Sequence, residues 1–335
     1  MNEISSSQTI IHLEEGAKTI EIDTQKFMYS AAFLVGGKQV VSIGADEKIR
    51  RWRAEDGTEV GTPIHAENNG RHLAVSRDGK WVVSGTWNGE VTVWNAGSHS
   101  KVTEFKTQSI DVCVADISPD ATRIATGSTK RAAWVWSLST GKRLLGPLQH
   151  DWCLAGVKFS PNGCLLATAT DTCDEHGKSI RIYDSQNGHL LVDVPIQVNS
   201  WLNQSLAWVS NGKQLFALSH DSHINCLDVY TGTTVSKWPI HSNNDPKCIS
   251  LASNGMFIAA SANSSLSFWD TTTHQQIGSV IEYSHVIWSM AISVNYDIVV
   301  GGDRITLRRL WDILPSSYAD VVSVPTSSSM REMVF

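Results

Sequence analysis

The chain has 335 residues, 41% of them hydrophobic and 18% charged, so it has enough apolar material for a folded core and fewer charges than the roughly 25% typical of soluble domains. A formal net charge of −6, with no run of about five or more basic residues, argues against nucleic acid as the main partner. The six cysteines include no C-x-x-C pair, so they indicate neither a disulfide framework nor a zinc site, and we expect reduced thiols.

The beginning of the chain shows no targeting signal. Its first residues, MNEISSSQTI, lack a positively charged region followed by an apolar segment, and no apolar run of about 18 residues occurs in the chain. We therefore expect an intracellular and most simply cytoplasmic protein without membrane insertion. Residues 1–8 are expected to form a short extension before the first strand.

The first predicted strand is TIIHLE, residues 9–14, and after it one strand pattern recurs along the chain. Examples of this pattern are KIRRWRAEDG at 48–57, EVTVWNAG at 90–97 and SLSFWDTTTH at 265–274. The same position, separated by 42, 42, 47, 44, 42 and 42 residues, is held by Trp52, Trp94, Trp136, Tyr183, Leu227, Trp269 and Trp311. A fixed period of roughly 40 to 45 residues is typical of a repeat architecture whose units bury their faces against one another. The recurring tryptophans are therefore predicted to lie in the core.

Turn residues divide each repeat into short strands. A first strand ends in a turn such as SRDG at 76–79 or SPNG at 160–163, and an apolar second strand follows. The tight turn after the second strand often carries Asp or Asn, as at Asp46 and Asn88, whose side chains can bind the amides of the turn. Short strands, even spacing and glycine-rich turns predict antiparallel four-stranded sheets.

On these residues the chain resembles the WD40-repeat β-propeller family over roughly residues 9–313. The repeat at 149–184 matches best, with His150 at the position of the histidine in the family's Gly-His pair, and Asp270 and Asp312 complete literal Trp-Asp pairs. The family's hydrogen-bond chain of His, Ser or Thr, Asp and Trp is nowhere complete in the sequence.

The resemblance implies an all-β fold, a seven-bladed β-propeller of four-stranded antiparallel blades. An open ring would leave a sheet edge unpaired. We therefore expect residues 9–14 to close the ring as the missing outer strand of the seventh blade. The propeller is expected over residues 9–314, followed by a serine-rich flexible tail over 315–335.

Three departures from the repeat leave alternatives open. The segment 172–178, TCDEHGK, lengthens the fourth blade, and its spacing favours a solvated hairpin extension over a zinc or calcium site, so we expect no metal and no cofactor. Arg51 stands where other repeats have apolar residues, which implies a salt bridge, a slipped register or a guanidinium that faces a ligand. Asp303 precedes Trp311 by eight residues instead of six, so the register of blade seven is open by two positions.

Tryptophans outside the period are the candidates for a binding surface. Trp87 lies at the tip of a turn, where few neighbours can cover an indole ring. Protein interfaces favour Trp, Tyr and Arg, which predicts partner binding by four residues on the loop face, namely Trp87, Trp152, Trp201 and His220. The alternative is that each ring folds onto neighbouring loops. Three further tryptophans fall within predicted strands and are expected to pack, namely Trp81, Trp208 and Trp288.

The resemblance implies a non-catalytic platform that binds protein or peptide partners. One alternative is a propeller that binds small ligands or glycans, with equivalent aromatic pockets repeated around the ring. The other is an enzyme with groups gathered at the central channel. The motifs G-x-S-x-G, H-E-x-x-H and G-x-G-x-x-G are absent, so no catalytic residues are predicted, and Arg51 with Asp303 is the only hint of a channel site.

Overall fold

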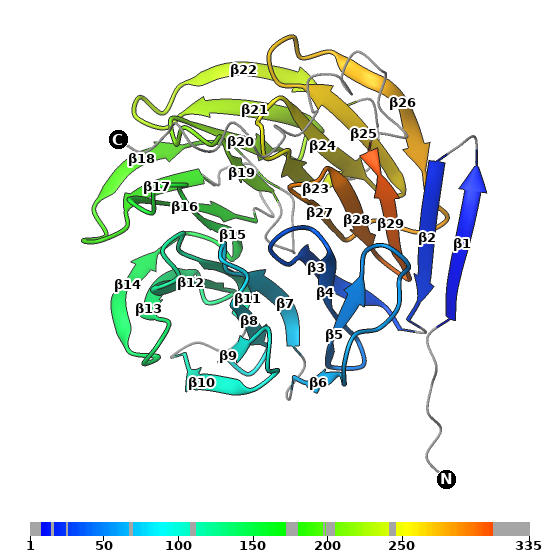
Figure 1. Ribbon diagram of the computed structural model, residues 1–335. Coiled ribbons are helices and arrows are strands. Elements are labelled where there is room, and N and C mark those ends of the chain that lie inside the picture. Colours follow the sequence, from blue (N-terminus) through cyan, green and yellow to red (C-terminus); the bar gives the residue numbers. More distant parts are fainter. Residues whose placement is uncertain are drawn as a thin grey trace, which may run out of the picture.

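A computed structural model describes residues 8–14, 17–24, 26–66, 70–107, 112–171, 180–196, 198, 205–240 and 246–310. Within these ranges the chain forms seven antiparallel sheets around a ring, and no helix (Figure 1). The sheets are the predicted blades, so the seven-bladed β-propeller is confirmed. Trp201, the insertion at 172–178 and the tail at 315–335 lie outside the described residues.

Each blade runs from an inner strand at the channel to an outer strand at the rim. Blade one comprises β3 (Met28–Phe33), β4 (Gln39–Gly44), β5 (Lys48–Arg53) and β6 (Ile64–His65). Blade two comprises β7 (Gly70–Val75), β8 (Trp81–Thr86), β9 (Glu90–Asn95) and β10 (Lys101–Lys106). Blade three comprises β11 (Val112–Ile117), β12 (Arg123–Ser128), β13 (Ala132–Ser137) and β14 (Arg143–Gln149). Blade four comprises β15 (Leu154–Phe159), β16 (Leu165–Thr170), β17 (Ile180–Asp184) and β18 (Leu190–Val194). Blade five comprises β19 (Leu206–Trp208), β20 (Gln214–Leu218), β21 (His223–Asp228) and β22 (Thr234–Pro239). Blade six comprises β23 (Pro246–Leu251), β24 (Phe257–Ala262), β25 (Ser265–Asp270) and β26 (Gln276–Glu282). Blade seven comprises β27 (Ser289–Ile292), β28 (Asp297–Gly301), β29 (Ile305–Arg309), β2 (Ala17–Asp23) and β1 (Gln8–Glu14).

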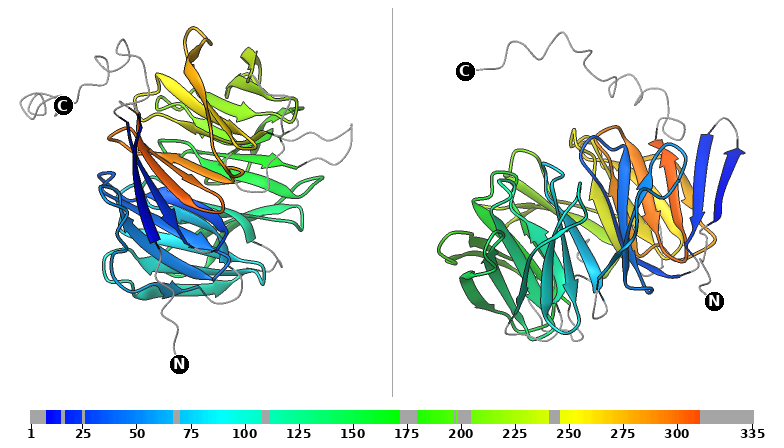
Figure 2. Two further views of the ribbon diagram at one scale, coloured as in Figure 1. Left: turned by 90° about the vertical axis from the view of Figure 1, so that its right-hand side faces the viewer. Right: turned by 60° about the horizontal axis from the view of Figure 1, so that its bottom comes forward.

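The N-terminal segment closes the ring, but through a different strand from the one predicted. In blade seven β2 pairs with β29, with Ile20 opposite Leu307 and Ile22 opposite Ile305, and β1 lies outside β2 as a fifth strand (Figures 1 and 2). Ile20 and Ile22 are 3% and 0% exposed and belong to one core cluster with Trp52 of blade one. Their alternation with polar residues matches a strand that buries one face. Residues 17–23 therefore supply the fourth strand, and the prediction for residues 9–14 was wrong.

The register of blade seven also differs from the sequence alignment. Ile298 pairs with Arg308 as Val40 pairs with Trp52, so Arg308 holds the recurring aromatic position, three residues before Trp311. These partners are 10 residues apart in blade seven and 12 in blade one, and the turn before β28 is one residue shorter than that before β4. The two shorter turns account for the shift of three residues. Trp311 itself lies outside the described residues.

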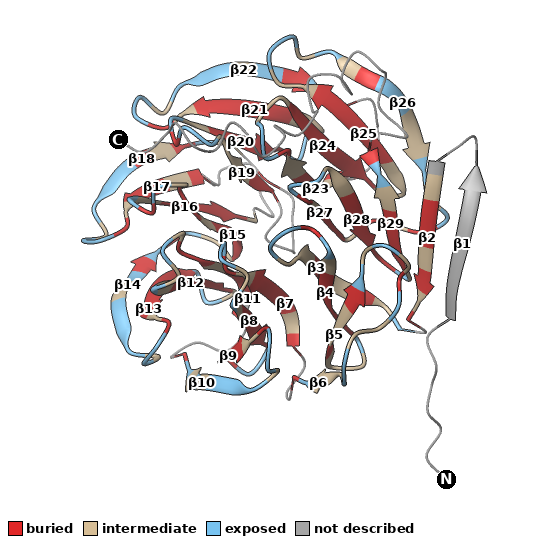
Figure 3. Ribbon diagram, viewed as in Figure 1, coloured by how far each residue is buried: buried red, intermediate tan, exposed pale blue. Residues whose placement is uncertain are grey.

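The recurring tryptophans are buried between blades, as predicted. Their exposed fractions are 0%, 7%, 4% and 3% for Trp52, Trp94, Trp136 and Trp269. In blades one to three the indole Nε1 donates to the neighbouring second strand, to Ser42 at 2.8 Å, Ser84 at 3.0 Å and Thr126 at 2.8 Å. Burial of the ring with its N–H satisfied stabilises the contact between blades. Figure 3 shows the buried inner strands and the exposed outer strands that result.

Two N-terminal truncations test the closing strand. Deleting residues 1–23 removes β2, and we expect the free energy of unfolding to fall by roughly 3–6 kcal/mol, because each buried isoleucine contributes about 1.5–3 kcal/mol. Deleting residues 1–14 removes β1 alone, leaves blade seven with four strands and is expected to cost much less. Urea unfolding of both variants measures the difference. Equal losses from the two truncations would show that β2 does not close the ring.

Candidate functional site

The loop face is the face of the ring that carries the turns between second and third strands and the segments leading into the inner strands. Trp87 lies there in the turn between β8 and β9 and is 46% exposed, as predicted. Trp152 is half-buried just before β15, and His220 is exposed in the turn before β21. Among the described residues no ring contact or hydrogen bond joins these three side chains to one another. These three predicted residues therefore lie on one face without forming one cluster.

The partner of Trp87 is a cation that the sequence analysis did not select. The Cζ atom of Arg71 lies 4.0 Å from the centroid of the Trp87 ring and 5.0 Å from that of Tyr29. Arg71 is thus held between two aromatic rings from neighbouring blades. This contact explains how an indole can remain at an exposed turn tip, since one of its faces packs against the guanidinium.

Further aromatic contacts extend this pair across the loop face. Ring centroids are 5.3 Å apart for Tyr29 and Phe27 and 5.6 Å apart for Phe27 and Trp288, and Lys247 Nζ lies 4.8 Å from the Trp288 ring. The side chains come from blades two, one, seven and six. We call them the aromatic–cation row: Trp87, Arg71, Tyr29, Phe27, Trp288 and Lys247.

β-Bulges place three members of the row. The register of the first pairing shifts around Tyr29 in β3, Arg71 in β7 and Lys247 in β23. A bulge residue leaves the regular alternation and turns its side chain in a new direction. The sequence carries a weak signal of this, because each of the three is the second residue of its inner strand, in MYSAAF, GRHLAV and PKCISL. Trp288, which was expected to pack within a strand, lies just before β27 and is half-buried.

A second stack of the same kind lies on the loop face. The exposed Arg131, in the turn between β12 and β13, places its Cζ atom 5.2 Å from the ring centroid of Trp152. Its backbone has a positive φ of 62°, which is uncommon for a residue other than glycine. One ring contacts this guanidinium, whereas two rings contact Arg71.

The central channel contains charged groups that pair with one another. A cavity of about 470 Å³ is lined by the inner strands of all seven blades. In it Lys158 Nζ lies 3.2 Å from Asp116 Oδ1, and the Phe159 amide donates to Asp116 Oδ2 at 2.8 Å. His72 Nε2 donates to the Ala115 carbonyl at 3.0 Å, and burial lowers the pKa of His72 to about 3. These contacts link inner strands of adjacent blades, so these groups stabilise the ring.

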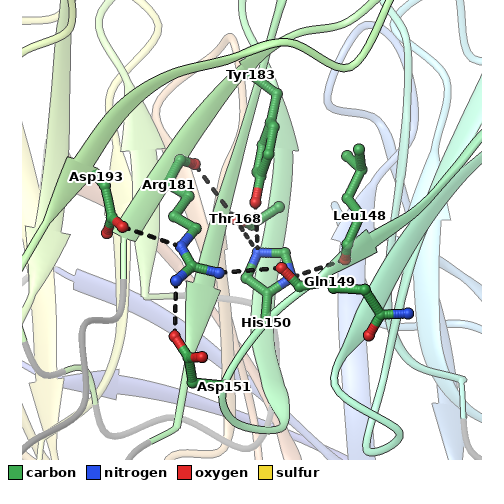
Figure 4. A network of polar contacts seen from close by, with 8 residues as sticks. All are labelled: Leu148, Gln149, His150, Asp151, Thr168, Arg181, Tyr183 and Asp193. Carbon is green, nitrogen blue, oxygen red and sulfur yellow. Dashed lines mark hydrogen bonds and ion pairs between the residues drawn. The ribbon is translucent and has the colours of Figure 1, made fainter.

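Blade four contains part of the buried hydrogen-bond chain described above, formed by His150, Thr168 and Tyr183 (Figure 4). His150 Nδ1 donates to the Leu148 carbonyl at 2.9 Å, and its Nε2 lies 2.9 Å from Thr168 Oγ1 and 3.3 Å from the hydroxyl of Tyr183. Beside it, Arg181 forms ion pairs at 2.7 Å and 3.3 Å with Asp151 and Asp193. Burial lowers the pKa of His150 to about 4. The neutral imidazole thus links the segment before β15 to the second and third strands of blade four.

Arg51 bridges two blades through a backbone carbonyl. It pairs in regular register with Val41, and its Nη1 donates to the Ala96 carbonyl of blade two at 2.6 Å. Burial lowers the pKa of this guanidinium. Among the described residues no carboxylate forms an ion pair with Arg51, so both the salt bridge and the slipped register were wrong expectations. The residue lies on the third strand, away from the channel lining.

Metal-binding and thiol chemistry find little support in the described part of the chain. No group of three or more His, Cys, Asp or Glu residues there could hold a metal ion. Burial raises the pKa of Cys226 to about 11 and that of Cys248 to about 12, so both thiols stay protonated at neutral pH. No helix among the described residues is long and apolar enough to cross a membrane.

Comparison with known proteins identifies similar sequences. The family profile described as anaphase-promoting complex subunit 4 WD40 domain matches residues 197–290, and that described as WD domain, G-beta repeat matches residues 63–95 and 143–184. The small ribosomal subunit protein RACK1y of Oryza sativa subsp. japonica is 28% identical over 168 residues, 48% of this chain and 44% of the relative. The autophagy-related protein 16 of Arabidopsis thaliana is 26% identical over 270 residues, 77% of this chain and 48% of the relative. The apoptotic protease-activating factor 1 of Homo sapiens is 28% identical over 233 residues, 66% of this chain and 17% of the relative. The chain therefore spans less than half the length of each of these relatives.

The buried histidines predict how stability depends on pH. Folding lowers the pKa of His72 and His150 from about 6.5, so between pH 6.5 and 4 the unfolded chain binds protons that the folded chain does not. The contribution of the two histidines to the free energy of unfolding is therefore complete above pH 6.5. It is lost as the pH drops, by at most about 1.4 kcal/mol per pH unit for each histidine.

Urea unfolding between pH 7 and 5 measures this slope while most carboxylates remain charged. His150→Gln is expected to reduce the slope, and His65→Gln, at an exposed position, is the matched control. An unchanged slope in His150→Gln would contradict the neutral buried imidazole.

Proposed function

Because the chain belongs to the WD40-repeat β-propeller family, we propose that it is a non-catalytic interaction platform that holds a protein or peptide partner on its loop face. The observation that supports this most is the aromatic–cation row. Aromatic and arginine side chains dominate the binding energy of protein interfaces, and here they form a continuous series of contacts across four blades of a rigid ring.

The names of the similar proteins support a role in assemblies. One relative is a ribosomal subunit protein by name, and one matching profile is that of an anaphase-promoting complex subunit. We extend to this chain only the general role of contacting other proteins. The net charge of −6 favours proteins over nucleic acid as partners. The free thiols of Cys153, Cys164, Cys226 and Cys248 fit a reducing compartment, and we propose the cytoplasm.

The distribution of the row favours one asymmetric partner surface over repeated ligand pockets. A glycan-binding propeller would carry equivalent aromatic pockets around the ring, whereas the inner-strand bulge position holds Tyr29, Arg71 and Lys247 in three blades and Ala155 in blade four. Side chains this different suit the varied surface of a protein.

Affinity capture with matched variants tests the proposal. We expect the wild-type chain to capture specific partners from a native extract and Trp87→Ala/Trp288→Ala to lose them, because the variant removes both tryptophan rings of the row. Tyr230→Ala is the control, since Tyr230 is 68% exposed in the turn between β21 and β22 on the opposite face. Quantitative mass spectrometry of the captured proteins measures the difference, after thermal melts show that all variants fold.

Two outcomes would count against the loop face. The double variant could capture the same proteins as the wild type, or Tyr230→Ala could lose the same proteins as the double variant. Either result would move the binding surface elsewhere on the ring.

A further inference from the structure

Arg71 differs from Arg51 and Arg181 in how its charge is accommodated. Arg51 donates to a carbonyl, Arg181 pairs with two carboxylates, and Arg71 has neither kind of partner among the described residues. Its contacts are the rings of Trp87 and Tyr29 at 4.0 Å and 5.0 Å. A half-buried guanidinium is therefore held in place with its N–H donors unused.

The geometry of a guanidinium explains what this arrangement can bind. Its five N–H donors lie in one plane and point outward from the edge, while its flat faces stack on aromatic rings. Two rings over Arg71 restrict its rotamers before any partner arrives, so less side-chain entropy is lost when its donors engage an acceptor. A carboxylate and a phosphate group each offer two oxygens that match a fork of two parallel N–H groups.

We propose that Arg71 binds a carboxylate of the partner, presented by a linear peptide segment in which Asp or Glu adjoins an aromatic or aliphatic residue. The apolar neighbour would pack on the exposed ring of Trp87. This inference rests on the proposed function, because it assigns the chemistry of the same face.

A carboxylate fits this site better than a phosphate group does. Phosphorylated segments are recognised by clusters of arginines, which neutralise a dianion. Among the described residues, Arg71 is the one cation stacked on Trp87 and Tyr29, and the row continues from Tyr29 to the uncharged Phe27. One positive charge between apolar surfaces matches one negative charge beside an apolar side chain.

The stack of Arg131 on Trp152 supplies a matched control. Both arginines lie over a tryptophan on the loop face, but Arg131 is exposed and contacts one ring at 5.2 Å. If any arginine near a tryptophan sufficed, the two positions would behave alike.

Selection from a phage library of random linear dodecapeptides tests the proposal on the full chain. Peptides that bind the wild type are expected to share an acidic residue next to an apolar one. A fluorescein-labelled consensus peptide is then titrated by fluorescence polarisation. Arg71→Gln should weaken binding about tenfold or more, because a charge-assisted pair of hydrogen bonds is lost. Arg71→Lys should bind with intermediate affinity because it keeps the charge without the fork, and Arg131→Gln should bind as the wild type does.

Changing the peptide distinguishes the sources of the anion. Replacing its Asp or Glu by Asn or Gln should weaken binding to the wild type and have little effect on Arg71→Gln, since a double-mutant cycle isolates the pair. An amidated C-terminus should change nothing if the carboxylate belongs to a side chain. Tighter Arg71-dependent binding of a phosphoserine peptide would overturn the carboxylate assignment.

The remaining outcomes separate this inference from the proposed function. Binding that falls with Trp87→Ala/Trp288→Ala but not with Arg71→Gln would overturn the carboxylate inference and leave the loop face as the docking surface. Failure to enrich any peptide, or binding indifferent to all these variants, would count against both.

Discussion

Every sheet of this ring buries its faces against its two neighbours, so blade seven must meet blade one before either is fully covered. That meeting depends on β2, which comes from the N-terminal end of the chain and pairs with β29 near the end of the described residues. Ile20 and Ile22 then share a core cluster with Trp52 of blade one. The remaining contacts between blades repeat this burial, with the tryptophan N–H satisfied by Ser or Thr of the adjacent strand in blades one to three. A closed ring also leaves no inner sheet edge open to other chains.

Because the ring is closed, the loop face is a rigid support for side chains that do not contribute to the core. Five inner strands bulge at the same place, after Met28, Gly70, Val112, Leu154 and Pro246, and the bulged residue differs in each blade. The repeat can thus keep one backbone while it varies the chemistry at one position per blade. Tyr29, Arg71 and Lys247 occupy that position where the aromatic–cation row crosses blades one, two and six.

Buried polar groups and exposed ones serve different purposes in this molecule. His72, His150 and the Asp116–Lys158 pair are partnered within the ring, and burial keeps both imidazoles neutral. Arg71 is the contrasting case, a charge stabilised by ring faces instead of by an acceptor. A group whose hydrogen bonds remain unmade at a surface is available to a partner, whereas a satisfied buried group chiefly stabilises the fold.

The sequence by itself determined the ring, its seven repeats and the buried tryptophans, because the period and the turn residues are local features that recur in each repeat. It also located Trp87 at an exposed turn. Only the tertiary structure decided that β2 closes the ring, that Arg308 and not Trp311 aligns with Trp52, and that Arg71 lies between Trp87 and Tyr29. The first depends on pairing across nearly the whole chain, the second on turns shortened by a few residues, and the third on bulges that turn side chains out of register. None of these leaves a repeated pattern, since each arises from contacts between segments that are distant in the sequence or from a local break in the period.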